Sequence, residues 1–93
     1  MAAGPPVRRR VVVYGRVQGV FFRDSLRHRA ASSGVGGWAA NRPDGTVEAV
    51  FEGPQDAVQA LVEFCRTGPS RAEVTRIEVA DEQPEGLAGF QIG

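Results

Sequence analysis

Residues 7–14 read Val-Arg-Arg-Arg-Val-Val-Val-Tyr, a segment with a β-branched centre that is typical of a strand, in which successive side chains point to opposite faces. One face of this segment carries three valines and one arginine, and the other carries two arginines, a valine and a tyrosine. The alternation predicts a strand whose valine-rich face meets the hydrophobic core. We expect the consecutive residues Arg8, Arg9 and Arg10 to be solvated at the start of this strand, without a part in any site.

Two later segments have the apolar spacing of helices. Between residues 22 and 33 apolar side chains recur every four positions, which predicts a helix that Gly34 ends. A second helix is predicted to begin at Pro54 and to end before Gly68. Its apolar stripe consists of Ala57, Val58, Leu61, Val62, Phe64 and Cys65.

The remaining strands, together with the first strand and the two helices, give the order of elements along the chain. Strands over residues 36–42 and 46–52 are predicted to form a hairpin, because the Asp-Gly pair between them suits the positive φ angles of a tight turn. A strand over residues 74–80, a loop over 81–89 and a short strand over 90–92 follow. This order predicts an α+β fold, a ferredoxin-like βαββαβ two-layer sandwich whose antiparallel sheet carries two helices on one face.

Length, charge balance and cysteine count limit the classes of protein to which this chain can belong. The 93 residues fit one small domain, predicted over residues 7–93 after a disordered lead-in at residues 1–6. Eleven arginines balance eleven acidic residues, which argues against long-range capture of nucleic acid or of an anionic membrane. No segment reaches the length of a membrane span. Cys65 is the single cysteine, so we expect no disulfide, no metal site and a reducing, cytoplasmic setting.

The candidate chemistry lies between the first strand and the first helix, where residues 15–23 read Gly-Arg-Val-Gln-Gly-Val-Phe-Phe-Arg. Two glycines at such a junction predict a loop whose backbone N–H groups are outside a β-ladder, and these groups bind anions together with the positive end of the helix dipole. Arg23 would add a guanidinium from the first helical turn. The residues alone leave an anion site and a purely structural turn both open, and the spacing is not that of a nucleotide-binding P-loop.

This stretch, together with residues 37–48, Gly-Trp-Ala-Ala-Asn-Arg-Pro-Asp-Gly-Thr-Val-Glu, resembles the acylphosphatase family over about residues 7–92. The resemblance implies the same ferredoxin-like fold. It also implies a small stand-alone enzyme that hydrolyses the carboxyl-phosphate anhydride of small acyl phosphates to carboxylate and inorganic phosphate. Ala39 and Ala40 are smaller than the residues that many members carry there, which bears on substrate affinity.

The resemblance also implies roles for individual residues. Arg23 and Asn41 stand at the catalytic positions, with Asn41 orienting the attacking water. The phosphate is expected to be held by Arg23 and by the backbone amides of Arg16, Val17, Gln18, Gly19 and Val20. No metal or cofactor is expected, inorganic phosphate is expected as product and inhibitor, and the protein is expected to be a monomer.

Other interpretations of single residues follow from sequence context. An asparagine near the end of a hairpin strand is ordinarily a turn-former, so Asn41 has a structural alternative. His28 lies five residues beyond Arg23 and hence on a different helical face, where a surface histidine is expected. The alternative function is a noncatalytic anion- or RNA-binding ferredoxin-like module, for which only Trp38 and Tyr14 offer stacking surfaces.

Overall fold

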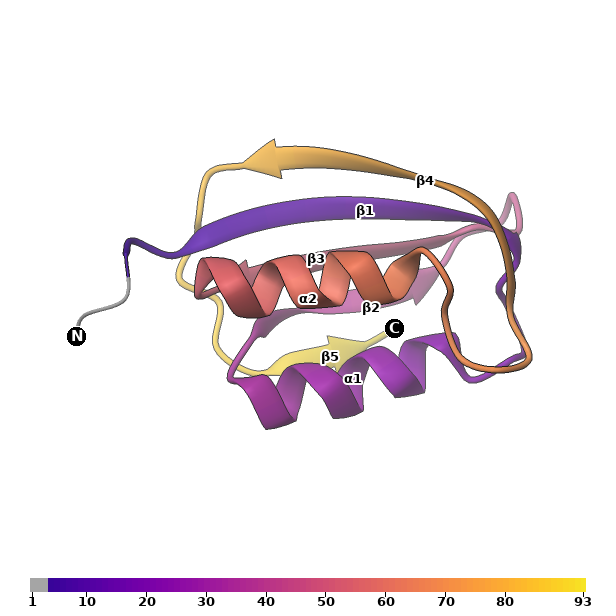
Figure 1. Cartoon of the computed structure of the whole chain (residues 1–93), viewed down its shortest axis with the longest axis horizontal. Coiled ribbons are helices and arrows are strands. Elements are labelled where there is room, and N and C mark those ends of the chain that lie inside the picture. The colour runs from indigo at the N-terminus through magenta and orange to yellow at the C-terminus, as the bar shows by residue number, and fades with distance from the viewer. Residues whose placement is uncertain (1–3) are drawn as a thin grey trace.

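The structure, a computed structural model, describes residues 4–93 as two layers, a five-stranded sheet and two helices that cover one of its faces (Figure 1). The chain runs through β1 (Val7–Arg16), α1 (Phe22–Ser33), β2 (Gly36–Asn41), β3 (Val47–Gly53), α2 (Gln55–Cys65), β4 (Glu73–Glu82) and β5 (Phe90–Ile92). The predicted ferredoxin-like arrangement is confirmed. Of the predicted lead-in, residues 1–3 lie outside the described residues and residues 4–6 are exposed.

The strands lie in the order β4-β1-β3-β2-β5. The three pairings among β4, β1, β3 and β2 are antiparallel, as predicted, whereas β5 pairs in parallel with β2. The sheet is therefore mixed, because the chain after β4 passes from one edge of the sheet to the other before it forms β5. This crossing brings the end of β5 to the start of α1 (Figure 1).

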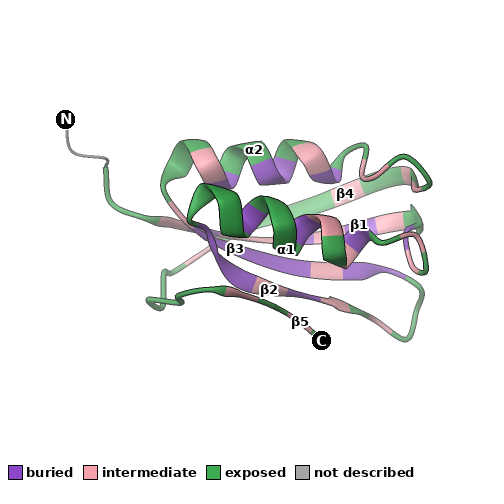
Figure 2. Ribbon diagram, turned by 90° about the horizontal axis from the view of Figure 1, so that it is seen from below, coloured by how far each residue is buried: buried purple, intermediate pink, exposed green. Residues whose placement is uncertain are grey.

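The core lies between the helices and the sheet, where the buried residues of both layers face each other (Figure 2). Val11 and Val13 of β1 are fully buried, which confirms the prediction from the alternating pattern. The helices contribute Phe22, Leu26, Ala30, Val58, Leu61, Val62 and Cys65. Each buried side chain of the size of valine or phenylalanine stabilises the fold by about 1.5–3 kcal/mol relative to an exposed one. The core therefore holds both helices on the sheet.

The opposite face of the sheet carries ion pairs, and here one prediction is wrong. Arg8 is only 6% exposed, and its guanidinium donates hydrogen bonds to Glu82 at 2.8 Å and to Glu52 at 3.4 Å. Arg10 pairs with Glu82 and with Glu48. The antiparallel register sets Arg8 opposite both Glu52 and Glu82, so acidic neighbours replace the water that a lone arginine would need.

Glu52 also fixes the chain that leads into β5. Its carboxylate accepts hydrogen bonds from the backbone N–H groups of Glu85, Gly86 and Leu87, at 2.9, 2.6 and 3.0 Å. Charged acceptors form stronger hydrogen bonds than neutral ones. This carboxylate therefore anchors the segment whose continuation, β5, reaches the start of α1.

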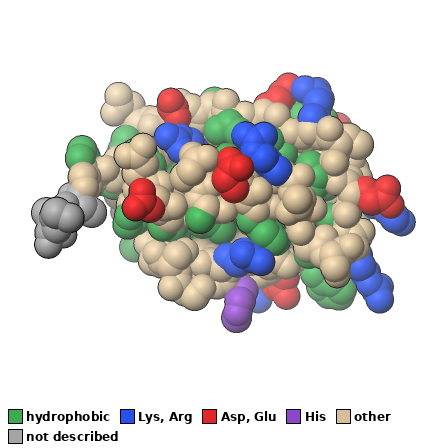
Figure 3. Space-filling model, viewed as in Figure 1, with side chains coloured by type: hydrophobic (Ala, Val, Ile, Leu, Met, Phe, Trp, Pro, Cys, Tyr) green, Lys and Arg blue, Asp and Glu red, His purple; other side chains and the backbone are tan. Residues whose placement is uncertain are grey.

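The helix-bearing face shows positive and negative side chains interspersed with hydrophobic and other groups (Figure 3). Within residues 4–93 no helix is both long enough and apolar enough to cross a membrane.

Candidate active site

β1 runs two residues further than the valine pattern predicted and ends at a bulge against β4. The register between the two strands shifts after Tyr14, and Gly15 has a φ of 122°. A Cβ atom at Gly15 would lie 2.1 Å from the carbonyl oxygen of Glu73, so this close approach requires glycine. The loop therefore begins at Val17, and Arg16 belongs to the strand.

Residues 17–20 form the loop that leads into α1. Val17 is buried and Val20 packs against the core, whereas Gly19 is exposed with a φ of 73°. Among residues 4–93 no hydrogen-bond acceptor is assigned to the backbone N–H groups of this loop. The first turn of α1 closes with the bond from the N–H of Ser25 to the carbonyl oxygen of Phe21, so the preceding helical N–H groups also lack an intrahelical acceptor. These donors suit an anion.

Arg23 stands in the first turn of α1 and is half-buried. Its Nη1 donates a hydrogen bond to the backbone oxygen of Gly93, which follows β5. The backbone N–H of Gly93 in turn donates to the carbonyl oxygen of Ala39 at 2.9 Å. Because a guanidinium has five N–H donors, Arg23 keeps donors for a ligand while this contact orients it.

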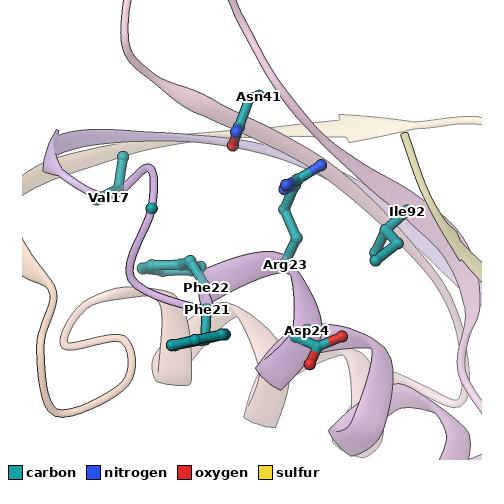
Figure 4. A pocket seen from close by; sticks show the side chains of 8 residues that line it. Val17, Phe21, Phe22, Arg23, Asp24, Asn41 and Ile92 are labelled. Carbon is teal, nitrogen blue, oxygen red and sulfur yellow. The ribbon is translucent and has the colours of Figure 1, made fainter.

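Asn41 is the last residue of β2 and is exposed. In the close view its side-chain amide and the Arg23 guanidinium project into the same space, from β2 and from α1 respectively (Figure 4). No hydrogen bond of the Asn41 side chain is found within residues 4–93. The structure thus offers no support for Asn41 as the residue that shapes the turn.

Asp44 shapes that turn instead. Its carboxylate accepts hydrogen bonds from the hydroxyl of Thr46 at 2.6 Å and from the backbone N–H of Thr46 at 3.0 Å. These two bonds lower the pKa of Asp44 below its ordinary value. With the turn closed by Asp44, the side chain of Asn41 is left available on the pocket side.

The loop, α1, β2 and β5 surround a pocket of about 330 Å³. It is lined by Val17, Gly19, Phe21, Phe22, Arg23, Asp24, Asn41 and Ile92 (Figure 4). Both predicted catalytic residues and two of the predicted loop residues therefore meet in one cavity. Four lining residues were not predicted as site residues: Phe21, Phe22, Asp24 and Ile92. The first three stand inside or beside the loop motif, which was the available signal.

The other predicted site residues do not line this pocket. The exposed guanidinium of Arg16 forms an ion pair with the carboxylate of Glu73 in β4, at an N–O distance of 2.5 Å. Its positive charge is therefore directed to β4 and not to the pocket. Gln18 directs its side chain to the turn between β2 and β3, and Val20 packs against the core. Any role of these three residues in anion binding rests on their backbone N–H groups, as predicted. Ala39 is buried in the core, and Ala40 is half-buried beside Gly93.

Two further side chains were candidates for chemistry because of their type. His28 is exposed on α1 and lines an adjoining hollow rather than the pocket. Cys65 is fully buried, and burial raises the pKa of its thiol to about 12, which leaves no thiolate at neutral pH. Within residues 4–93 no three His, Cys, Asp or Glu side chains are grouped so that they could hold a metal ion.

Comparison with known proteins gives one consistent result. The acylphosphatase family model matches residues 9–92. An acylphosphatase of Haloarcula marismortui is 55% identical over 85 residues, which is 91% of this chain and 93% of the relative. Among solved structures, the acylphosphatase from Bacillus subtilis is 40% identical with a TM-score of 0.89, covering 94% of this chain and 98% of that one. An acylphosphatase from Coxiella burnetii is 34% identical with a TM-score of 0.90, covering 96% and 94%. The chain belongs to the acylphosphatase family of enzymes.

Proposed function

We propose that the pocket beside the start of α1 hydrolyses the carboxyl-phosphate anhydride of a small acyl phosphate to a carboxylate and inorganic phosphate. The observation that carries this proposal is the meeting of Arg23, Asn41 and the loop of unbonded backbone N–H groups around one cavity. A permanent cation, a set of fixed dipoles and a neutral amide are the groups that an acyl phosphate needs. The family's reaction supplies the chemical class.

The phosphoryl group is bound by the loop and Arg23. The N–H groups of residues 17–20 and of the first turn of α1 donate to its oxygens, and the guanidinium adds two parallel donors. Negative charge on the phosphoryl oxygens is redistributed as the reaction proceeds, and preorganised donors stabilise it without reorganising. Removal of one such donor ordinarily costs about 10²–10³-fold in kcat.

Asn41 orients the water molecule that attacks phosphorus. A side-chain amide donates through its NH₂ group and accepts through its oxygen, but it does not take up a proton at ordinary pH. The water oxygen forms the new bond to phosphorus, the bond from phosphorus to the carboxylate oxygen breaks, and its electron pair leaves with the carboxylate. The proton of the water passes to a phosphate oxygen of the substrate. The contribution of Asn41 is thus positional.

No cofactor or metal ion enters this scheme. A carboxylate is a stable leaving group, so it departs without protonation by a strong acid. Arg23 supplies the positive charge that many phosphoryl-transfer enzymes obtain from Mg²⁺. The proposal includes a cytoplasmic monomer whose ligands are the acyl phosphate and inorganic phosphate, with neither nucleic acid nor membrane as a partner.

The test is release of inorganic phosphate from acetyl phosphate by the purified protein, with Arg23→Ala as the matched control. We expect wild-type turnover at neutral pH, competitive inhibition by inorganic phosphate, and turnover by the variant lower by at least about 10²-fold. Retention of labelled RNA on a filter is measured on the same preparation. Tight RNA binding without phosphate release would instead favour the noncatalytic module.

A further inference from the structure

Phe21 is an exposed aromatic residue at the rim of the proposed phosphate pocket. Its side chain is 71% exposed, against 42% for Val79 and 37% for Leu87, the other large apolar side chains exposed within residues 4–93. An aromatic ring carries a large apolar area, which a bound ligand can cover. The ring lines the same pocket as Arg23 and Asn41.

The backbone holds this ring outward by an unusual conformation. Phe21 has a φ of 64° and a ψ of 25°, the left-handed region, and it is the one residue other than glycine with positive φ in the described chain. Bulky residues seldom adopt this region. As a consequence, Phe22 turns into the core, where its ring centroid lies 6.1 Å from that of Phe64, while Phe21 faces the pocket. A strained residue of this kind is more common at functional sites than elsewhere.

A second hollow of about 380 Å³ continues from the pocket past Phe21, which lines both together with Asp24. Two charged groups that border this hollow are engaged with neighbours. Asp24 pairs with Arg27 at 2.8 Å, and the guanidinium of Arg29 lies 3.8 Å from the centre of the Phe64 ring. The Phe21 ring is therefore the main apolar surface that a ligand in this hollow would contact.

The in-line geometry of phosphoryl transfer places the acyl group on the side of the pocket where Phe21 lies. In phosphoryl transfer the attacking and leaving oxygens lie roughly in line with phosphorus. In Figure 4 Asn41 lies at the upper side of the pocket and Phe21 at its lower side, with Phe22 and Arg23 at intermediate heights. A water molecule held at Asn41 therefore has the leaving carboxylate opposite to it, toward Phe21.

We propose that Phe21 forms an acyl-group subsite, which favours acyl phosphates with an aromatic or other bulky apolar acyl group over those with a small one. This inference rests on the proposed function, because it assigns the part of the substrate that leaves. The ring of Phe21 stacks on or packs against the acyl group, while Arg23 and the loop amides hold the phosphoryl group. The part of the ring exposed to water is covered when such a substrate binds.

The experiment compares kcat/KM for benzoyl phosphate and for acetyl phosphate in the wild type, Phe21→Ala and Phe21→Gly. The ratio of the two values is expected to fall about tenfold in both variants, the factor that one aromatic contact contributes. Glycine suits the left-handed backbone, so the Phe21→Gly protein is expected to melt at or above the temperature of Phe21→Ala. Val79→Ala, which removes an exposed apolar side chain of β4, is the matched control and should leave the ratio unchanged.

Two results would overturn the subsite. One is an equal fall of both kcat/KM values, which would mean that Phe21 only shapes the loop. The other is an unchanged ratio in folded variants that still show competitive inhibition by phosphate. If the wild type releases phosphate from neither compound, the proposed function itself is wrong and the subsite is lost with it.

Discussion

The side-chain amide of Gln18 donates a 2.7 Å hydrogen bond to the backbone carbonyl oxygen of Arg42, the residue that follows Asn41. The same nitrogen donates to the carbonyl oxygen of Thr46 at 2.9 Å. The loop that presents the proposed anion-binding amides is thus tied to the turn that follows Asn41. This connection fixes the distance between the proposed phosphate site and the proposed water site.

Replacing Gln18 with alanine is expected to loosen that connection. Two hydrogen bonds are lost, so the free energy of unfolding should fall by about 1–2 kcal/mol. The kcat for acetyl phosphate should fall by about tenfold, because a small displacement of a reacting group costs rate. Urea unfolding and steady-state kinetics check both expectations. Gln55→Ala is the control, because Gln55 is an exposed glutamine of α2 whose side chain makes no hydrogen bond within residues 4–93. A destabilised Gln18→Ala protein with wild-type kcat would show that the hydrogen bonds are only structural.

Arg23 is expected to be the most sensitive side chain for turnover. Arg23→Ala should lose at least about 10²-fold in kcat/KM, because the phosphoryl group loses its side-chain cation. Arg23→Lys should also be strongly impaired, since an ammonium group cannot donate two parallel hydrogen bonds in the guanidinium geometry. Kinetics and circular dichroism are measured together, with Arg66→Ala, at the exposed residue that follows α2, as the control. Wild-type rates in a folded Arg23→Lys protein would exclude bidentate binding.

Turnover is expected to survive both chelation and thiol alkylation under native conditions. In the proposed scheme Arg23 supplies the positive charge, and the buried thiol of Cys65, with a pKa of about 12, is neither ionised nor accessible. Phosphate release is measured after dialysis against EDTA and after treatment with iodoacetamide. The scheme fails if EDTA abolishes the activity and added Mg²⁺ or Zn²⁺ restores it.

Glu52 is expected to make the free energy of unfolding depend on pH. Burial alone would raise the pKa of this carboxyl, but the N–H groups of residues 85–87 and the Arg8 guanidinium outweigh burial and lower the pKa below the ordinary 4.5. Its contribution to the free energy of unfolding is therefore complete above the ordinary pKa and is lost as the pH falls through the lower pKa of the folded protein.

Urea unfolding of Glu52→Gln at two pH values checks this expectation. At pH 7 the variant should be less stable than the wild type by about 2 kcal/mol, since hydrogen bonds to a charged group contribute about 1.5–3 kcal/mol. Below the folded pKa of Glu52 the two proteins should converge, because the wild-type carboxyl is then neutral too. Glu63→Gln, on the exposed face of α2, is the control. A difference that is the same at both pH values would contradict the assignment.

The elements of the fold could be predicted because each has a local signal. Helix α1 begins and ends where its apolar period and Gly34 predicted, and Gly34 has the expected left-handed φ of 71°. The parallel pairing of β5 has no such signal, because it depends on where residues 83–89 cross the sheet. The burial of Arg8 was missed for a similar reason: its acidic partners are 44 and 74 residues away in the chain.

The candidate site was predictable in part. The family motifs led to Arg23 and Asn41, and both line the pocket. The physical reason that Asn41 is available, the closure of its turn by Asp44, is a matter of side-chain geometry that the sequence leaves open. Phe21 was missed because two consecutive phenylalanines give the same apolar signal, and only the positive φ of the first separates an outward ring from a buried one.

The central claim is that binding of the phosphoryl group and positioning of water are carried by different residues. Measurement of kcat and of the inhibition constant of inorganic phosphate for Asn41→Ala, beside the wild type, tests it most directly. We predict that phosphate still inhibits competitively with a similar constant, while kcat falls by about 10²-fold with little change in KM. A folded variant that keeps most of its kcat, or one in which phosphate inhibition disappears together with turnover, would contradict the claim.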